Sequence, residues 1–263
     1  MVSAIGDLGT LRAGGRMTLP SHKSGQKVPA IRSWATWVGL ALFAVLASPS
    51  AGRSDDTAPQ LVPVARSRLC VTEGALEALQ GARFSVGTAK LRAVLAASGM
   101  QAIEAHFTYL GPTAEIAPLR SGAVRQQFGL KLRAADGCNL VYAMWRFAPQ
   151  PSLIVSVKSN PELHSSRACG TSGYRTVTPR RQSPVEAPQI GTAHRLAAAL
   201  DGAELRVLID GRPVWEGELG PEALAADGPV GIRSDNARLE LSLFAPPDTA
   251  RDVCPKPGGA EEE

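Results

Sequence analysis

The feature that most constrains this fold is an alternation of apolar and polar side chains with a period of two residues, which recurs from residue 102 to residue 244. In the last alternating segment, residues 237–244, the apolar positions are Leu239, Leu241 and Leu243, and the polar ones are Arg238, Glu240 and Ser242. Successive side chains of a β-strand point to opposite faces of a sheet. Each segment of this kind is therefore predicted to be a strand that buries one face.

The same pattern predicts further strands at residues 102–110, 127–133, 139–147, 152–158, 194–200, 204–209, 213–219 and 230–233. Asp-Gly dipeptides separate several of these strands, which favours hairpins, because a type I′ turn needs positive φ at both central residues. Helical patterns are few: residues 72–80 could form one short helix and residues 221–226 a single turn. About nine or ten short strands predict an all-β fold, an antiparallel jelly-roll β-sandwich.

The N-terminal segment has a different character. Five basic residues precede an uncharged run of 14 residues, Trp34 to Ala47, which is followed by small residues. This order is typical of a secretory signal peptide, and the run is shorter than the roughly 20 residues of a membrane span. We expect a signal peptide at 1–51, a linker at 52–68, a single β-sandwich domain at 69–254 and a disordered tail at 255–263. The protein would then be secreted or periplasmic, with no stable membrane span after signal cleavage; an uncleaved anchor or a start at Met17 are the alternatives.

The positive net charge belongs to the N-terminal segment. The chain has a net charge of +4, with 28 Lys and Arg against 24 Asp and Glu. Residues 1–51 hold 5 of the basic residues and 1 of the acidic ones, which leaves 23 of each in the remainder. A protein that gathers phosphates needs an excess positive field. We therefore expect no nucleic-acid partner.

All 4 cysteines follow the predicted signal peptide. An even number of cysteines in an exported protein predicts two disulfides. Three pairings are possible, and we favour Cys70 with Cys254, which would tie the domain ends together, and Cys138 with Cys169, which would fasten a loop to a strand. No two cysteines are closer than 31 residues, which disfavours zinc. No metal or cofactor is predicted.

Two stretches of the C-terminal third, LAAALDGAELRVLIDGRPVWEGEL and DGPVGIRSDNARLELSLF, resemble the closing half of concanavalin A-like lectin/glucanase sandwiches. They are most similar to the 3-keto-disaccharide hydrolase type of secreted bacterial domain. The matching residues are Ile209, Asp210, Gly211, Val214, Trp215, Gly228, Pro229, Val230, Gly231, Ile232, Arg233, Ser234, Asp235 and Asn236. The resemblance implies that residues 227–244 form the last hairpin of a jelly roll. Gly228 and Gly231 would let the backbone pass close to a neighbouring strand.

A polar sheet face is the candidate binding site. If the four strands between residues 102 and 158 form one sheet, one face collects Glu104, His106, Lys131, Arg133, Tyr142, Arg146, Ser156 and Lys158. The opposite face carries Phe107, Phe128, Leu130, Trp145, Phe147, Val155 and Val157 into the core. Sandwiches of the kind that the resemblance implies usually hold a glycan on one sheet face, and arginine beside tyrosine suits an acidic or hydroxyl-rich ligand. The alternative is the ordinary polar exterior of an antiparallel sheet.

These observations favour binding over catalysis. Glycosidases of this architecture need two carboxylates across a cleft, but no E-x-D-x-x-E run occurs in the sequence. A Gly-rich phosphate loop and an H-E-x-x-H motif are also missing. We therefore predict an exported protein that binds carbohydrate or another cell-envelope component without catalysis. A glycoside hydrolase of the same fold and a structural or adhesive module are the alternatives.

Overall fold

The computed structural model describes residues 60–97, 99–247 and 254. The chain divides into residues 1–54 and residues 55–263, and every described residue belongs to the second unit. The predicted signal peptide and the predicted tail at 255–263 lie outside the described residues. In the described ranges, none of the helices combines the length and the apolar composition that crossing a membrane requires.

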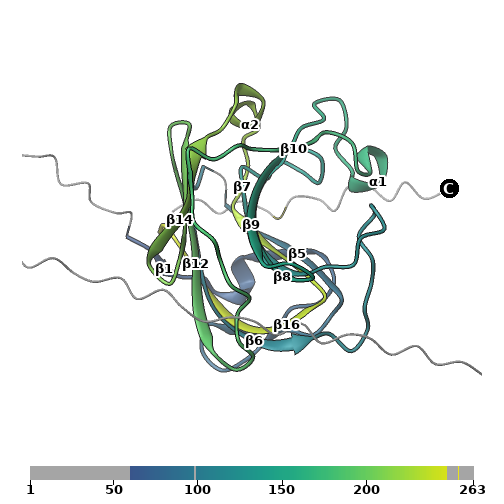
Figure 1. Ribbon diagram of the computed structural model, residues 1–263, viewed down its shortest axis with the longest axis vertical. Coiled ribbons are helices and arrows are strands. Elements are labelled where there is room, and N and C mark those ends of the chain that lie inside the picture. The colour runs from purple at the N-terminus through teal and green to yellow at the C-terminus, as the bar shows by residue number, and fades with distance from the viewer. Residues whose placement is uncertain (1–59, 98, 248–253, 255–263) are drawn as a thin grey trace, which may run out of the picture. The chain divides into compact units, whose positions relative to one another are not determined.

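Two antiparallel sheets pack face to face, as Figure 1 shows for β12 and β14 in one layer and β8 and β9 in the other. The nine-stranded sheet contains β1 (Val62–Pro63), β3 (Glu77–Ala78), β4 (Arg83–Val86), β6 (Ala102–Pro112), β11 (Arg181–Gln182), β12 (Ala193–Asp201), β13 (Glu204–Ile209), β14 (Arg212–Glu218) and β16 (Ala237–Ala245). The seven-stranded sheet contains β2 (Leu69–Glu73), β5 (Lys90–Leu95), β7 (Gln126–Leu132), β8 (Leu140–Ala148), β9 (Ser152–Lys158), β10 (Tyr174–Thr176) and β15 (Gly231–Asp235). The predicted all-β antiparallel sandwich is confirmed.

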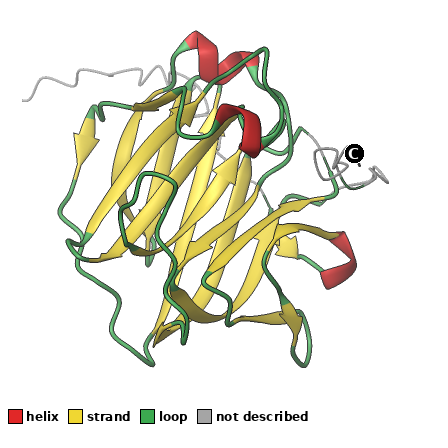
Figure 2. Cartoon of the chain, turned by 90° about the vertical axis from the view of Figure 1, so that its right-hand side faces the viewer, coloured by secondary structure: helices red, strands yellow, loops and turns green. Residues whose placement is uncertain are grey.

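The strand order of the seven-stranded sheet is β10-β9-β8-β7-β15-β5-β2, and that of the other sheet is β11-β14-β13-β12-β6-β16-β4-β3, with β1 beside β16. Three short helices, η1 (Arg66–Arg68), α1 (Ser166–Cys169) and α2 (Pro221–Ala225), lie in the connecting loops (Figure 2). The single helical turn predicted at 221–226 is therefore present. β1 and η1 fall within the stretch expected to be a linker.

The core lies between the sheets and is made by the apolar half of each alternating strand. All seven residues predicted to face it are buried, namely Phe107, Phe128, Leu130, Trp145, Phe147, Val155 and Val157. Trp215 of β14 is 1% exposed and also belongs to this cluster. Burying apolar surface stabilises a fold by roughly 25 cal/mol per Å², so the alternation itself specifies the two-layer arrangement.

The predicted helix at residues 72–80 is wrong. This stretch contains the end of β2 and then β3, which pairs with β4. Gly74 separates the two strands with a φ of +78°, a left-handed conformation that interrupts a right-handed helix. Leu76 is buried in the core, so tertiary packing overrides the weak helical preference of the segment.

The predicted last hairpin is also wrong. β15 pairs with β5 and β7 in one sheet, whereas β16 pairs with β4, β6 and β1 in the other. The chain changes layers at Asn236, whose φ is 53°. Asparagine tolerates this left-handed conformation better than most residues, so the Asp-Asn dipeptide makes a corner between sheets.

The hairpin between β13 and β14 is as predicted. Its two loop residues, Asp210 and Gly211, have φ values of 51° and 77°, which is the type I′ requirement. In the hairpin between β12 and β13, Asp201 still pairs with Glu204, so the loop is shifted one residue along to Gly202 and Ala203.

Two disulfides join Cys70 to Cys254 and Cys138 to Cys169, which is the pairing favoured from the sequence. The first connects β2 to the C-terminal segment. The second connects the loop before β8 to α1. Closing loops of 184 and 31 residues restricts the unfolded chain, which is worth roughly 2–4 kcal/mol for each bond.

The Gly231→Ala substitution tests how closely β15 lies against β5. A Cβ atom at Gly231 would lie 2.2 Å from the Ala93 carbonyl oxygen and 2.8 Å from the Val94 Cα. We expect the free energy of unfolding, measured by urea denaturation, to fall by about 1–3 kcal/mol. Gly87→Ala is the matched control, because nothing lies within 4 Å of that position, and it should leave stability unchanged or raise it slightly. Equal effects of the two substitutions would contradict this account.

Candidate functional site on the outer face of the seven-stranded sheet

The four strands expected to share one sheet do not all share it. β7, β8 and β9 are neighbours in the seven-stranded sheet, but β6 lies in the other sheet between β12 and β16. Glu104 and His106, which β6 carries, are therefore separated from the other predicted site residues. Their side chains contact each other, and the His106 ring lies 4.4 Å from the Phe244 ring. The prediction that they join the site is wrong.

The rest of the predicted face is largely brought together. Cross-strand register places Lys131 opposite Tyr142, Tyr142 opposite Ser156, and Lys158 opposite Tyr174 of β10. Arg146 stands on the same face, two residues along from Met144. Arg133 departs from this face, because it follows the end of β7 with a φ of 49° and donates hydrogen bonds to the backbone of the segment around α2.

A cavity of about 430 Å³ lies over this face. Strands β2, β5, β7, β8, β9, β10 and β15 contribute lining residues. Loop residues 119–121, 170 and 171 and Ser166, the first residue of α1, also line it. The lining residues that the argument uses are Glu73, Lys90, Arg92, Arg120, Arg125, Gln127, Tyr142, Arg146, Ser156, Lys158, Tyr174 and Arg233. Tyr142, Arg146, Ser156 and Lys158 were predicted from the alternation, whereas the other lining residues were missed.

A buried carboxylate organises the floor of the cavity. Asp235 is fully buried, and its two oxygens accept hydrogen bonds from Arg92 at 2.6 Å, Arg233 at 2.8 Å and Gln127 at 2.6 Å. Burial alone would raise the pKa of Asp235, but the positive charges of Arg92 and Arg233 outweigh it and hold that pKa below its ordinary value. The carboxylate therefore stays ionised and fixes both guanidinium groups.

Two tyrosines and two cations form the aromatic part of the site. The rings of Tyr142 and Tyr174 stack with centroids 6.1 Å apart and an interplanar angle of 19°. The Arg233 guanidinium lies 4.9 Å from the centre of the Tyr142 ring, and Lys158 Nζ lies 5.1 Å from that of Tyr174. Such cation–π contacts favour a positive charge above the ring face. Tyr142 is buried, which raises its pKa to about 12, whereas Tyr174 is 44% exposed.

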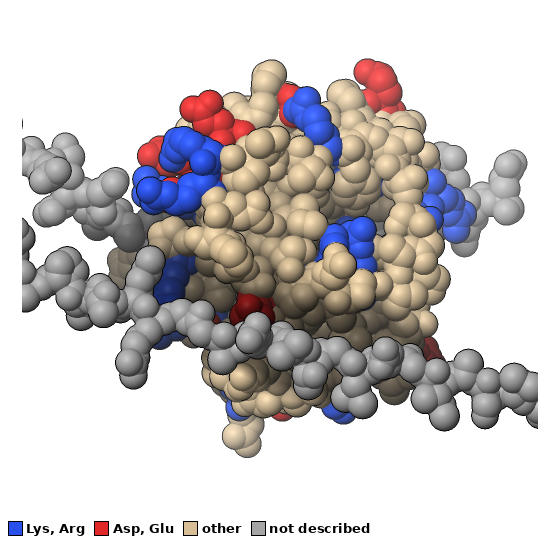
Figure 3. All heavy atoms as spheres, viewed as in Figure 1, with Lys and Arg blue, Asp and Glu red and all other residues tan. Residues whose placement is uncertain are grey.

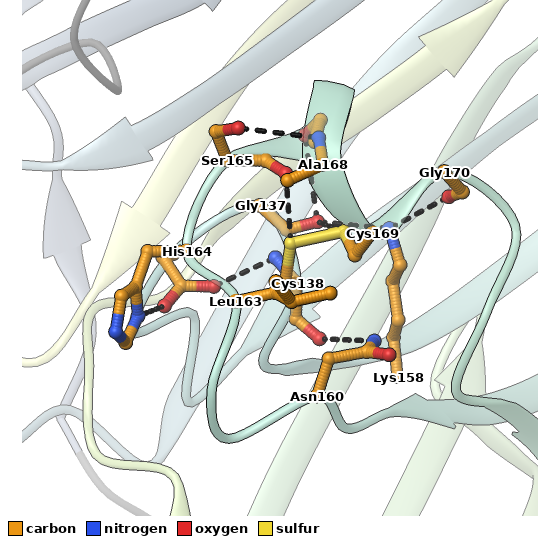
Figure 4. Close-up of a disulfide and its surroundings, with 12 residues drawn as sticks. Gly137, Cys138, Lys158, Asn160, Leu163, His164, Ser165, Ala168, Cys169 and Gly170 are labelled. Carbon is orange, nitrogen blue, oxygen red and sulfur yellow. Dashed lines mark hydrogen bonds and ion pairs between the residues drawn. A yellow bond between two sulfur atoms is a disulfide. The ribbon is translucent and has the colours of Figure 1, made fainter.

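The disulfide between Cys138 and Cys169 supports one side of the cavity (Figure 4). Lys158 extends from β9 and donates hydrogen bonds to the carbonyl oxygens of Gly137 at 3.1 Å and Gly170 at 3.0 Å. Both acceptors adjoin a cysteine of this disulfide, and Gly137, Lys158 and Gly170 all line the cavity. The bond therefore fixes the position of the loop that borders Lys158.

Asn236 holds the opposite side in place. Its side-chain oxygen accepts a hydrogen bond from Ala117 N at 2.8 Å, and its amide nitrogen donates to the carbonyl oxygens of Ala117 and Arg125, each at 2.9 Å. The loop thus anchored carries Arg120 and Arg125 to the cavity. The corner residue between the two sheets is therefore also a support of the site.

Lys131 stands on the same sheet face, opposite Tyr142, but it is almost completely buried and is not among the residues that line the cavity. Burial lowers its pKa to about 7, with Arg92 and Arg233 acting in the same direction and with Glu73 and Asp235 opposing. Because the surroundings already contain two guanidinium groups, the charged form of Lys131 is disfavoured in the folded protein. No group of three or more metal-ligating side chains was found in the described ranges.

A search of protein-family models and a search of curated proteins found no match. Among solved structures, the chain is similar to the carbohydrate binding module CBM66 from Bacillus subtilis, with 13% identity, a TM-score of 0.46, and 66% of this chain and 91% of that chain covered. It is also similar to the metal-free carbohydrate recognition domain of Emp46p, with 10% identity, a TM-score of 0.45, and 71% and 89% covered. A third similar structure is the apo Crh5 transglycosylase, with 14% identity, a TM-score of 0.40, and 72% and 82% covered. Likeness at this distance assigns no function.

The Lys131→Met substitution tests the electrostatics of the outer sheet face. An unfolded lysine has a pKa near 10.4, whereas that of Lys131 is lowered to about 7. The cost of charging Lys131 is therefore present in full below pH 7 and disappears as the pH rises toward 10.4. We expect the free energy of unfolding of the variant to exceed that of the original protein by the largest amount at pH 6. This difference should decrease steadily as the pH is raised to 10. Urea denaturation of both proteins across this pH range measures the difference. A difference that does not change with pH would contradict the lowered pKa of Lys131.

Proposed function

We propose that this is an exported protein that binds carbohydrate, as found in a cell-envelope glycan, in the cavity on the outer face of the seven-stranded sheet, without catalysis. The observation that carries this proposal is the stacked pair Tyr142 and Tyr174, flanked by Arg233 and Lys158 inside an open cavity. An exposed aromatic ring offers the apolar faces of a sugar a flat contact surface, and guanidinium and ammonium groups donate hydrogen bonds to its oxygens.

The size and polarity of the cavity support a sugar-sized ligand. A volume of about 430 Å³ falls within the roughly 300–1,000 Å³ of small-molecule sites. The hydroxyl groups of Ser156 and Thr176 and the amide of Gln127 line it together with the charged groups. A hydroxyl-rich ligand can therefore find both donors and acceptors.

The distribution of carboxylates favours binding over hydrolysis. Glycoside hydrolases need two carboxyl groups roughly 5–10 Å apart on either side of the bond they cleave. Among the described lining residues, Glu73 is the only carboxylate. Asp235 is fully buried and engaged by Arg92 and Arg233, so its oxygens cannot reach a sugar. A hydrolase, including one of the 3-keto-disaccharide type, is the competing outcome of the test below.

Export is supported by the two disulfides, because structural disulfides persist mainly in oxidising compartments. The apolar run that would direct export lies outside the described residues.

The Tyr174→Ala substitution tests the proposed site. We expect the purified protein to bind one or more polysaccharides on a glycan array. The variant should bind the same polysaccharides about tenfold more weakly, equivalent to ~1.4 kcal/mol. Ile190→Ala removes an even more exposed apolar side chain, 67% accessible, outside the cavity lining and should bind normally. Titration calorimetry with the retained polysaccharide gives the dissociation constants.

Two results would contradict the proposal. If Tyr174→Ala and the original protein bind equally well, the ligand does not lie on this face. Release of reducing ends from any polysaccharide incubated with the protein would show catalysis and favour the hydrolase.

A further inference from the structure

The cavity concentrates positive charge in a stretch of the chain, residues 52–263, whose net charge is zero. Residues 52–263 hold equal numbers of basic and acidic residues, as counted above. On the face drawn in Figure 3, Lys and Arg side chains form small groups separated by uncharged surface, with acidic side chains beside some of them. The described lining of the cavity, by contrast, contains seven cations and one carboxylate, and the cations are Lys90, Arg92, Arg120, Arg125, Arg146, Lys158 and Arg233.

Only part of this charge is neutralised within the protein. Arg92 and Arg233 share the carboxylate of Asp235, and Arg92 also lies 3.7 Å from Glu73. Lys158 is hydrogen-bonded to two carbonyl oxygens, which carry no net charge. Within residues 60–97, 99–247 and 254, no carboxylate is paired with the other four cations, which are Lys90, Arg120, Arg125 and Arg146.

Arg146 shows most directly that a partner is missing. Its Nε atom is buried and has no hydrogen-bond partner in the described structure. Burial lowers the pKa of Arg146, and the positive charge of Arg125 lowers it further, so Arg125 repels this guanidinium. A buried donor without an acceptor is unfavourable, and more so when it is charged. An anion bound beside the exposed part of the Arg146 guanidinium would relieve the repulsion from Arg125.

A second corner of the cavity has the same character. Lys158 is 3% exposed, and burial lowers its pKa to about 8, with Arg233 and Arg120 acting in the same direction and Asp136 opposing. The positive charges of Arg120 and Arg233 therefore act on Lys158, whose Nζ atom lies 5.1 Å from the centre of the Tyr174 ring. Anionic groups spaced along an extended ligand could meet this corner and the Arg125–Arg146 corner together.

We propose that the ligand of this cavity is an acidic glycan, in which sugar rings contact Tyr174 while carboxylate or sulfate substituents pair with Arg146, Arg125 and Arg120. A guanidinium group can donate two parallel hydrogen bonds to the two oxygens of a carboxylate. A sulfate group offers a similar pair of acceptor oxygens. This inference rests on the proposed function and adds the chemical class of the glycan. Neutral glycans would leave the positive charges of Arg120, Arg125 and Arg146 without an opposite charge.

The experiment compares polysaccharides that differ only in charge. Polygalacturonate, alginate and hyaluronan are each offered to the purified protein with their carboxyl-reduced forms, and dextran sulfate is offered with dextran. We expect at least one acidic polymer to bind at least about tenfold more tightly than its neutral counterpart. A preference within the first three pairs identifies carboxylate as the recognised group, and a preference confined to dextran sulfate identifies sulfate.

Substitutions separate a specific site from general attraction between opposite charges. Arg146→Gln should weaken binding of the acidic polymer about tenfold, and Arg146→Lys should weaken it less because the charge is kept. Neither should alter the affinity for a neutral polymer. Arg212→Gln is the matched control, because this exposed arginine of β14 has the same charge and lies outside the cavity lining; it should bind like the original protein.

Three outcomes would overturn the inference. Equal affinity for acidic and neutral polymers would leave the proposed carbohydrate function standing and remove its acidic specificity. Equal weakening by Arg146→Gln and Arg212→Gln would reduce the preference to non-specific attraction. If no polysaccharide of either kind binds, the proposed function fails together with this inference. Thermal melting of each variant excludes unfolding as the cause of any loss.

Discussion

The buried carboxylate of Asp235 is the interaction on which the outer face of the seven-stranded sheet depends. Taking an ion out of water costs several kcal/mol, and only close opposite charges and hydrogen bonds recover that cost. These charges and hydrogen bonds come from Arg92 on β5, Gln127 on β7 and Arg233, which lies two residues before Asp235 on β15. Three adjacent strands are thereby joined on their outer face by side chains as well as by their backbone ladders, and two guanidinium groups acquire fixed positions.

The segment that contains Asp235 contributes to both the fold and the site. Gly231 allows β15 to lie against β5, Arg233 and Asp235 build the cavity floor, and Asn236 turns the chain into the opposite sheet. Asn236 also anchors the loop that carries Arg120 and Arg125. A substitution within residues 231–236 would therefore change both the packing of the two sheets and the arrangement of charges in the cavity.

The two-layer fold could be predicted from the sequence because the alternation reports directly which side chains of a strand are buried, as Phe128 and Trp145 show. The same pattern says nothing about which strands are neighbours. β6 precedes β7 in the chain but pairs with β12 and β16 in the other sheet. Glu104 and His106 were therefore assigned to the wrong sheet. Asp235 was named only as one of the residues that carry the family resemblance, and its partner Arg92 lies 143 positions away. Only the three-dimensional pairing of β5 with β15 reveals that contact.

The locked guanidinium groups have a consequence for the thermodynamics of recognition. A long, flexible side chain normally loses rotational freedom when it grips a ligand, and this loss subtracts from affinity. Arg92 and Arg233 have already lost that freedom, because Asp235 holds them whether or not a ligand is present. The entropic cost was met when the chain folded, so a ligand that contacts these two groups would not incur it again.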